Sequence, residues 1–423
     1  MRNSHQKQNV MEEYRYALKG AQLGSLCGSG IIVGLSSTIT VWQSAINLTD
    51  LQVGWISALL MLAIAIGSLG AGKFSQSLGL KRSFLILLPV YFVGALISAF
   101  SFHFYLLCLG VMICGITSGA DLAISLSFLS IIARNEKISA RLISSTQVYW
   151  SLGCLLTNLL AFATSTLPGA WSGRLEMVLL MAAAALGLMY RRKACEINAA
   201  SLPQENSETE HQPSLGHLFA SGSSINYKAL FGCILFFYCA SNLLANTFGQ
   251  FQTFLLVKAD ASQSLATGIN VLLGIGSLLI AQGFSRVAAD RMRNRLFGVG
   301  IVIMAGALLS MALAGSALWL IVIGLALYNF GSMMAGESLM KVWTQESFPP
   351  QYRSSIQGLI VGGSRLLCAA FAVVTPALVL PSTISLTMIG FAILILLAGA
   401  AGFEQMRLQK KFHLGALKEK AEE

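Results

Sequence analysis

The sequence predicts an all-α membrane protein with twelve transmembrane helices arranged in two halves of six. Three observations predict this class: a strongly apolar composition, twelve apolar runs of spanning length, and basic residues gathered on one side of those runs. Of the 423 residues, 55% are hydrophobic and 11% are charged, and the mean hydropathy is +0.69. Soluble domains carry roughly 25% charged residues, so the composition excludes a soluble enzyme.

Each apolar run is long enough to cross the hydrocarbon core of a bilayer, which needs about 20 helical residues. The runs fall at approximately 20–42, 52–72, 83–102, 105–132, 143–165, 173–190, 228–256, 263–284, 297–315, 317–340, 355–380 and 383–403. Little of the chain is left to form a folded domain outside the membrane.

The positions of Lys and Arg predict that both termini are cytoplasmic. With that orientation, 25 of the 28 basic residues lie in cytoplasmic segments, and two, Arg174 and Lys258, lie on the opposite side. Basic residues near helix ends are retained on the cytoplasmic side. We therefore expect a multi-pass protein of the cell inner membrane.

A polar stretch divides the twelve runs into two sets of six. Its charged and small polar residues are typical of a flexible linker. We expect an N-terminal six-helix bundle over 1–190, a cytoplasmic linker over 191–227, and a C-terminal six-helix bundle with a cytoplasmic tail over 228–423.

The two halves show traces of a duplication. Matching Gln76 with Asp290 gives an offset of 214 residues, and matching Arg141 with Arg353 gives 212. Two loops thus agree to within two residues, which predicts two six-helix pseudo-repeats. In transporters built on this plan, the transport site lies between the repeats near the bilayer midplane.

Charge and motifs exclude several other functions. A net charge of +10 would favour nucleic-acid binding only if the basic residues formed one face of a soluble domain. In this chain the charges lie between apolar runs. The eight cysteines form no C-x-x-C pair, so no metal site is indicated. The chain has no P-loop, no H-E-x-x-H and no Ser-His-Asp arrangement in a loop large enough for a site. We expect no enzymatic activity, no cofactor and no bound metal.

Several segments resemble the major facilitator superfamily. Residues 346–353 match E-x-x-P-x-x-x-R, a pattern that the sugar-porter branch has after helices 4 and 10. Segments 119–121, 147–153 and 336–346 are similar to bacterial sugar and polyol porters, above all to those related to myo-inositol transporters. The resemblance covers nearly the whole chain. It implies a secondary transporter that moves a sugar, polyol or related small metabolite by alternating access, coupled to protons.

The sequence departs from this family at positions that bear on coupling. Gln76 stands where the helix 2–3 loop has Asp, and Arg134 and Lys137 stand where the helix 4–5 loop has Glu and Pro. Gly28 stands where related symporters often carry the proton-binding Asp of helix 1. Any proton is therefore expected to bind elsewhere.

Three ionisable residues fall clearly inside the predicted spans, and such residues are functional candidates because burying a charge is costly. Asp121 has no basic residue within a turn of its own helix, so we expect it to be the proton-coupling residue. The alternative is a fixed hydrogen bond to hydroxyls of helix 1 or 2. Glu337 and Arg365 are predicted at similar depth, and we expect a buried ion pair with either a switching or a structural role.

A polar stripe points to an uncharged polar substrate. Asn242, Asn246 and Gln250 are spaced i, i+4 and i+8, so they share one helix face within an apolar span. Together with Gln147 and Trp150 they offer hydrogen bonds and a ring face to a hydroxylated ligand. Gln147 also matches a glutamine that contacts sugar in the resembling family. The alternative for the stripe is hydrogen bonding between helices.

The resemblance also implies a cytoplasmic gate closed by salt bridges. The residues concerned are Arg141, Asp290, Arg291, Glu346 and Arg353. Retention of topology by positive charge is the alternative role for such residues.

We expect a monomer in the lipid bilayer whose partners are a small-molecule substrate and protons. Two other functions remain open at this point. Efflux of an amphipathic drug would require a wide, aromatic and acidic cavity, against which the polar stripe argues. A membrane sensor would bind the ligand without moving it, and the missing helix 1 Asp leaves that function possible.

Overall fold

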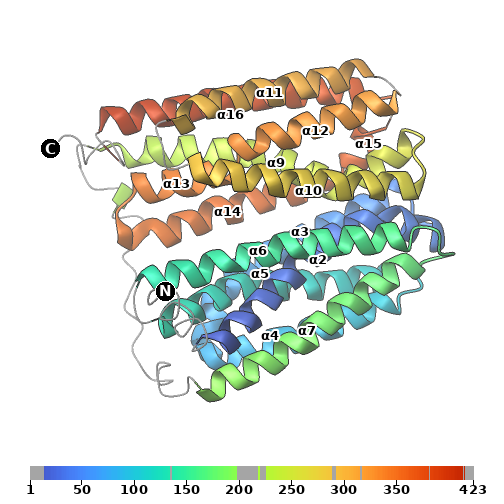
Figure 1. The fold of residues 1–423 in the computed structure, drawn as a ribbon, viewed down its shortest axis with the longest axis horizontal. Coiled ribbons are helices and arrows are strands. Elements are labelled where there is room, and N and C mark those ends of the chain that lie inside the picture. Colours follow the sequence, from blue (N-terminus) through green and yellow to red (C-terminus); the bar gives the residue numbers. More distant parts are fainter. Residues whose placement is uncertain are drawn as a thin grey trace, which may run out of the picture. The chain divides into compact units, whose positions relative to one another are not determined.

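The computed structural model is all-helical over the residues that it describes, which are 14–133, 136–197, 218–219, 225–287, 292–314, 317–380, 382–412 and 414. The chain divides into two compact units, Met1–Glu208 (unit 1) and Thr209–Glu423 (unit 2). Unit 1 contains α2 (Arg15–Ala45), α3 (Asp50–Leu78), α4 (Leu80–Ala99), α5 (Phe104–Ile132), α6 (Glu136–Ala163) and α7 (Trp171–Ile197) (Figure 1). Unit 2 contains α9 (Tyr227–Lys258), α10 (Gln263–Val287), α11 (Met292–Ala314), α12 (Leu318–Met334), α13 (Glu337–Ser347), α14 (Pro350–Ala372), α15 (Thr375–Leu378) and α16 (Ile384–Lys411).

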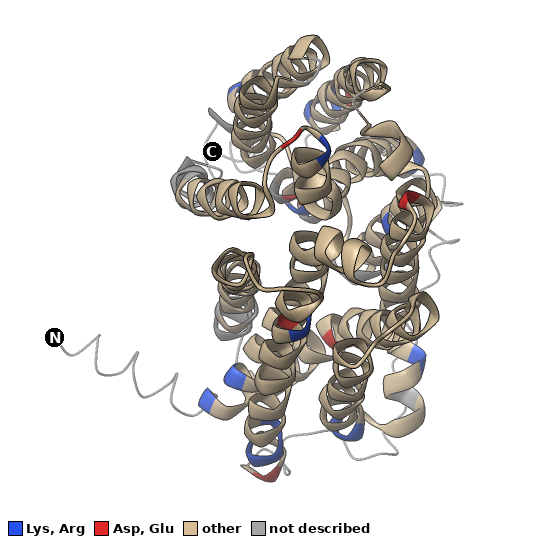
Figure 2. Cartoon of the chain, turned by 90° about the vertical axis from the view of Figure 1, so that its right-hand side faces the viewer, with Lys and Arg blue, Asp and Glu red and all other residues tan. Residues whose placement is uncertain are grey.

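The apolar runs form the long helices, so the predicted all-α class is confirmed over the described residues. Ten spans are long and apolar enough to cross a membrane, and they are 20 to 32 residues long. Two more helices, α6 and α10, contain 28 and 25 residues. Figure 2 shows how sparsely the ribbon carries charged residues. A charged side chain inside the bilayer needs a partner elsewhere in the protein, such as an opposite charge or a hydrogen-bonding group.

The central helix of unit 1 is α2. It packs against α5, α6 and α7, and almost every residue between Ala17 and Trp42 is buried. A helix that is buried on all sides belongs to the core of its unit. A polar group that points from a neighbouring helix toward α2 is therefore removed from both water and lipid.

Small residues let α3 and α5 approach closely. A Cβ added to Gly67 would overlap the carbonyl oxygen of Ile116, and one added to Gly119 would overlap that of Ile64. Ser68 Oγ donates to the Gly119 carbonyl at 3.2 Å, across the same contact. Contacts of this kind hold helices together in a membrane, where apolar surface alone gives little driving force.

A single residue, Gly79, separates α3 from α4. Its φ of +79° lies in the left-handed region, which glycine adopts without the steric cost that a side chain would add. The loop between the second and third apolar runs is therefore shorter than the sequence suggested.

In unit 2, α9 packs against α10, α13, α14 and α16. An aromatic cluster fills the unit, with Trp343 of α13 in edge contact with Phe237 at 5.0 Å and with Phe297 at 5.5 Å between ring centroids. Trp343 is fully buried. The cluster fixes α13 against α9 and α11.

The predicted helix over 317–340 is interrupted. Helix α12 ends at Met334, and α13 begins at Glu337 after two non-helical residues. The backbone of Gly336 comes so close to the Ser332 carbonyl that a Cβ would overlap it. The two glycine hydrogens permit this local turn, and a continuous helix through Glu346 is not formed.

The predicted boundary after residue 190 is also wrong in its structural detail. The sixth helix, α7, continues to Ile197, so Arg191 is helical and not part of a linker. Of the remaining linker positions, 198–217 and 220–224 lie outside the described residues.

Candidate functional site

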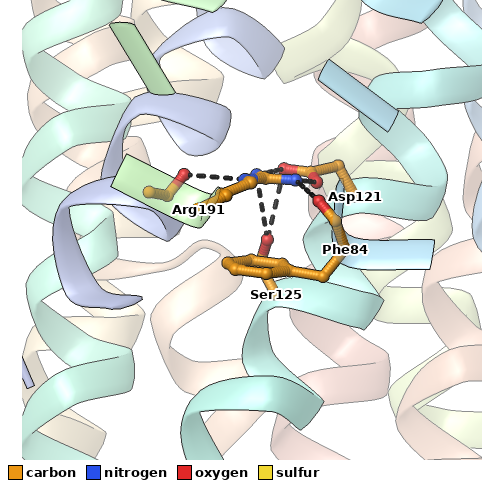
Figure 3. A network of polar contacts seen from close by, with 5 residues as sticks. Phe84, Asp121, Ser125 and Arg191 are labelled. Carbon is orange, nitrogen blue, oxygen red and sulfur yellow. Dashed lines mark hydrogen bonds and ion pairs between the residues drawn. The ribbon is translucent and has the colours of Figure 1, made fainter. Parts of the chain in front are cut away.

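A buried ion pair joins α7 to α5 in unit 1. Arg191 Nη1 lies 2.6 Å from Asp121 Oδ1, and Arg191 Nη2 lies 2.8 Å from Asp121 Oδ2 (Figure 3). The side chains are 0% and 5% exposed, respectively. The two parallel bonds form the bidentate geometry that arginine and carboxylate favour.

The other donors of Arg191 are also used. Nη1 donates to the Phe84 carbonyl at 2.7 Å, Nε donates to the Gly20 carbonyl at 3.2 Å, and Nη2 donates to Ser125 Oγ at 3.3 Å. A guanidinium has five N–H donors, and each has a partner here. The guanidinium also lies 4.2 Å from the ring centre of Phe84. Arg191 thereby connects α7 with α2, α4 and α5.

The expectation that Asp121 lacks a basic partner is therefore wrong. Sequence reasoning considered only neighbours on the same helix and assigned Arg191 to the linker. A helical side chain leans toward the N-terminus of its helix, and an arginine has a long apolar stem. Arg191 thus reaches back into the unit from beyond the end of the apolar run. An arginine directly after a run should be counted as a possible intramembrane partner.

Glycines of α2 make room for the pair. A Cβ on Gly20 would lie 2.7 Å from Arg191 Cγ, and a Cβ on Gly24 would overlap both Asp121 Oδ2 and Arg191 Nη2. These two positions pack directly on the network. A side chain at Gly24 requires either the carboxylate or the guanidinium to move.

A pocket opens beside the pair within unit 1. Asp121 and Ser125 line it together with Gly28 and Trp150. The Trp150 ring packs over Gly28, where a Cβ would lie 3.4 Å from the ring. The structure thus brings Trp150 and Asp121 to one pocket, whereas Gln147 is exposed and does not line it.

The polar stripe of α9 has two different parts. Asn242 Nδ2 donates to Ser364 Oγ of α14 at 3.1 Å, and Asn246 Oδ1 accepts from Arg365 Nη1 at 3.3 Å. These bonds join α9 to α14, which is the alternative role considered for the stripe. Both asparagines nevertheless remain partly exposed.

Gln250, the third member of the stripe, differs from the other two. Its residue is 3% exposed, and neither Nε2 nor Oε1 has a hydrogen-bond partner among the described residues. Its neighbour Gln252 instead donates to Asn270 Oδ1 at 2.8 Å. A buried amide without partners costs roughly 1–3 kcal/mol per group, so a ligand or water that fills both bonds would be strongly favoured.

The expected buried pair of Glu337 with Arg365 differs from the structure. Glu337 Oε1 pairs with Lys341 Nζ at 2.8 Å, one turn further along α13, and the Glu337 side chain is 52% exposed. The helix is interrupted before Glu337, so depth counted along a continuous helix does not apply. Arg365 donates to Asn246 of the polar stripe.

Most of the predicted gate cannot be described in contacts. Asp290 and Arg291 lie outside the described residues, and the side chains of Arg141 and Arg353 are likewise outside the description. Glu346 is partly buried, and its Oε2 accepts from Gln409 Nε2 of α16 at 3.4 Å.

Sequence reasoning missed one buried carboxyl. Glu176 of α7 is fully buried, Thr38 Oγ1 donates to its Oε2 at 3.5 Å, and Oε1 has no hydrogen-bond partner in the described part of the chain. Gly34 of α2 leaves the space that the carboxyl occupies. Glu176 lies within the apolar run 173–190, so a strict count of acids inside the runs would have found it.

The comparisons with known proteins agree with this architecture. A family model for the Major Facilitator Superfamily matches residues 21–373. The minor myo-inositol transporter IolF of Bacillus subtilis (strain 168) is 26% identical over 373 residues, which cover 85% of this chain and 83% of that protein. The glucose transporter GlcP of Staphylococcus epidermidis is 22% identical over 383 residues, which cover 82% of this chain and 83% of the relative.

Solved structures share the fold at low sequence identity. A D-xylose-proton symporter superposes with a TM-score of 0.73 at 16% identity and covers 91% of this chain and 97% of its own. The nucleoside transporter NupG gives 0.68 at 13% identity, covering 92% of this chain and 99% of its own. The family match over 21–373 spans more than half of the chain and extends into both units, so the chain belongs to the Major Facilitator Superfamily.

Proposed function

We propose that the protein is a secondary transporter that carries a sugar or polyol across the cell inner membrane by alternating access, coupled to protons. The observation that carries this proposal is Gln250, a buried amide on the polar face of α9 whose donor and acceptor have no partner among the described residues. The names of the relatives, which include a myo-inositol transporter and a glucose transporter, support the same class of substrate.

The chemistry of Gln250 fits a hydroxylated ligand. A hydroxyl group donates one hydrogen bond and accepts others, so two neighbouring hydroxyls satisfy Oε1 and Nε2 together. Asn242 and Asn246 lie on the same face of α9 and supply further amide groups. A drug-like apolar ligand would leave Gln250 unsatisfied, and each unfilled bond then costs affinity.

Unit 1 contributes an aromatic surface. Trp150 lines the pocket beside Asp121, and an indole ring provides a face on which the apolar side of a sugar ring packs. Gln147, one turn earlier on α6, is exposed and therefore available to a ligand. We assign Gln147 and Trp150 to substrate binding on these grounds.

Proton coupling is assigned to Asp121 together with Arg191. In the structure the carboxylate accepts two bonds from the guanidinium. Protonation neutralises the carboxyl and releases Arg191 in a second transport state. In this proposal the ion pair forms in one transport state and is broken in the other.

The magnitudes are compatible with such a switch. Separating a buried ion pair costs about 3–5 kcal/mol. A membrane potential contributes about 2.3 kcal/mol per charge and per 100 mV. A proton that enters down a potential of about 100 mV thus supplies about 2.3 kcal/mol, which is of the same order. A pair much stronger than this would not open.

The finer architecture follows from the same proposal. We propose that the ten apolar spans and the helices α6 and α10 all cross the membrane, which makes twelve crossings with both termini in the cytoplasm, and that the transport unit is a monomer. The gate residues keep their proposed role of closing the cytoplasmic side; they are Arg141, Asp290, Arg291, Glu346 and Arg353.

The test is uptake into proteoliposomes. Purified protein is reconstituted, and entry of radiolabelled myo-inositol, D-xylose and D-glucose is followed with and without an inward pH gradient. We expect saturable uptake of at least one of them, raised by the gradient. Binding of these ligands without uptake would establish a sensor. The absence of both binding and uptake would refute the substrate class.

A further inference from the structure

A second polar site lies at one end of unit 1, and neither Asp121 nor Arg191 lines it. It is a hollow between α2 and α7, and its lining residues are Arg15, Tyr16, Leu186, Met189, Tyr190 and Lys193. We infer that this hollow binds the headgroup of one anionic phospholipid, with an acyl chain along Leu186 and Met189.

The lining changes from charged to apolar along α7. Lys193 is exposed, Tyr190 is partly buried, and Leu186 and Met189 are 46% and 63% exposed. Their spacing of three or four residues places them on one face of the helix. A phospholipid has the same order of properties, with a phosphate above an apolar tail.

Two tyrosine rings lie with Lys193 at the charged end of the hollow. Tyr16 and Tyr190 lie 6.1 Å apart between ring centroids, and Lys193 Nζ lies 5.6 Å from the centre of the Tyr16 ring. Tyrosine at this depth is typical of the membrane interface. The rings therefore keep Lys193 on the side of α7 that faces Arg15.

The charges select an anion. Two cationic residues line the hollow, and no acidic residue does so among the described residues. Arg15 is the first residue of the span of α2 and Lys193 lies in the last turns of the span of α7, so both sit at the water boundary. Basic hollows between helices at that boundary bind anionic headgroups. With the proposed orientation, the lipid belongs to the cytoplasmic leaflet.

The neighbouring Arg192 provides a matched control. It is exposed on the same helix and does not line the hollow, so Arg192→Gln removes one charge beside the site but none within it. Arg15→Gln and Lys193→Gln remove the two cations of the site. All three positions are at the surface, and a melting curve in phosphatidylcholine checks that each variant is folded.

The experiment is native mass spectrometry of the full chain from mixed micelles with equal phosphatidylglycerol and phosphatidylcholine. We expect the unchanged protein and Arg192→Gln to retain one phosphatidylglycerol more often than phosphatidylcholine, by at least fivefold. The Arg15→Gln/Lys193→Gln double variant should retain both lipids equally. Equal retention of the two lipids by the unchanged protein overturns the inference. An equal loss of phosphatidylglycerol retention in Arg192→Gln and in the double variant also overturns the inference, because it would indicate attraction by net charge. Inorganic phosphate should not displace the lipid, and displacement would assign the site to free phosphate.

Discussion

Replacing Arg191 by Met should destabilise the protein by about 3–5 kcal/mol, because it leaves a buried carboxylate without its cation. Of the described partners of Asp121, Ser125 alone then remains, at 3.3 Å. Replacing Asp121 by Leu should cost a similar amount, since it leaves the guanidinium buried with only carbonyl and hydroxyl acceptors. The Arg191→Met/Asp121→Leu double variant removes both charges, so it should cost about 2–3 kcal/mol less than the sum of the single changes.

The assay is thermal unfolding of the purified protein in one detergent. For a unit of about 200 residues, 1 kcal/mol shifts Tm by roughly 2–4 °C, so each single variant should lower Tm by about 10 °C. Arg192→Met is the control, because its side chain is exposed and its loss should stay within about 0.5 kcal/mol. Single effects that add to within about 0.5 kcal/mol would refute the coupling between Asp121 and Arg191.

Three further predictions concern the two units separately. Gln250→Ala should weaken substrate binding, measured by titration, by about 1–3 kcal/mol. Gln252→Ala should not weaken it, because Gln252 is bonded to Asn270. Equal affinities in both variants would remove α9 from the site. Glu346→Gln should open the cytoplasmic side and raise labelling of an introduced cysteine there, and unchanged labelling would favour a role in topology alone. Gly24→Ala should lower stability by about 1–3 kcal/mol, because its Cβ overlaps the ion pair. Gly306→Ala should leave stability unchanged, because a Cβ there meets no atom within 4 Å. Unchanged stability in Gly24→Ala would contradict the packing.

The fold class was predictable because the bilayer leaves few options for an apolar chain. Every backbone group inside the hydrocarbon must be satisfied, and a run of about 20 apolar residues does so as a helix. The helix ends were less predictable. Arg191 continues α7 beyond its apolar run, because its charge is neutralised by Asp121 inside the unit and need not remain in water.

The candidate site was predicted by residue type and not by partner. The spacing of Asn242, Asn246 and Gln250 placed them correctly on one helix. The sequence does not show that α14 bonds to the two asparagines, whereas Gln250 has no partner in the part of the chain that the structure describes. Partners across helices depend on packing that one sequence does not reveal. The pairing of Glu337 with Lys341 has another cause. Helix α13 begins at Glu337 after a break that the apolar run did not predict, so Glu337 pairs four residues along its own helix.

The central claim is that Asp121 carries the coupling proton by releasing Arg191. Asp121→Asn keeps the size of the side chain and a hydrogen-bond acceptor for Arg191 but removes titration. Purified variant protein in liposomes is tested for accumulation of labelled myo-inositol after a pH jump and for counterflow exchange without any gradient. Counterflow shows that the variant is folded and still alternates between its two states.

The measurement that decides the claim is the ratio of pH-driven accumulation to counterflow in Asp121→Asn. The account predicts that accumulation disappears while counterflow persists, since exchange needs alternating access but no net proton movement. Accumulation against a gradient at the level of the unchanged protein would contradict the account, and the coupling proton would then have to bind elsewhere, with Glu176 as the next carboxyl to replace.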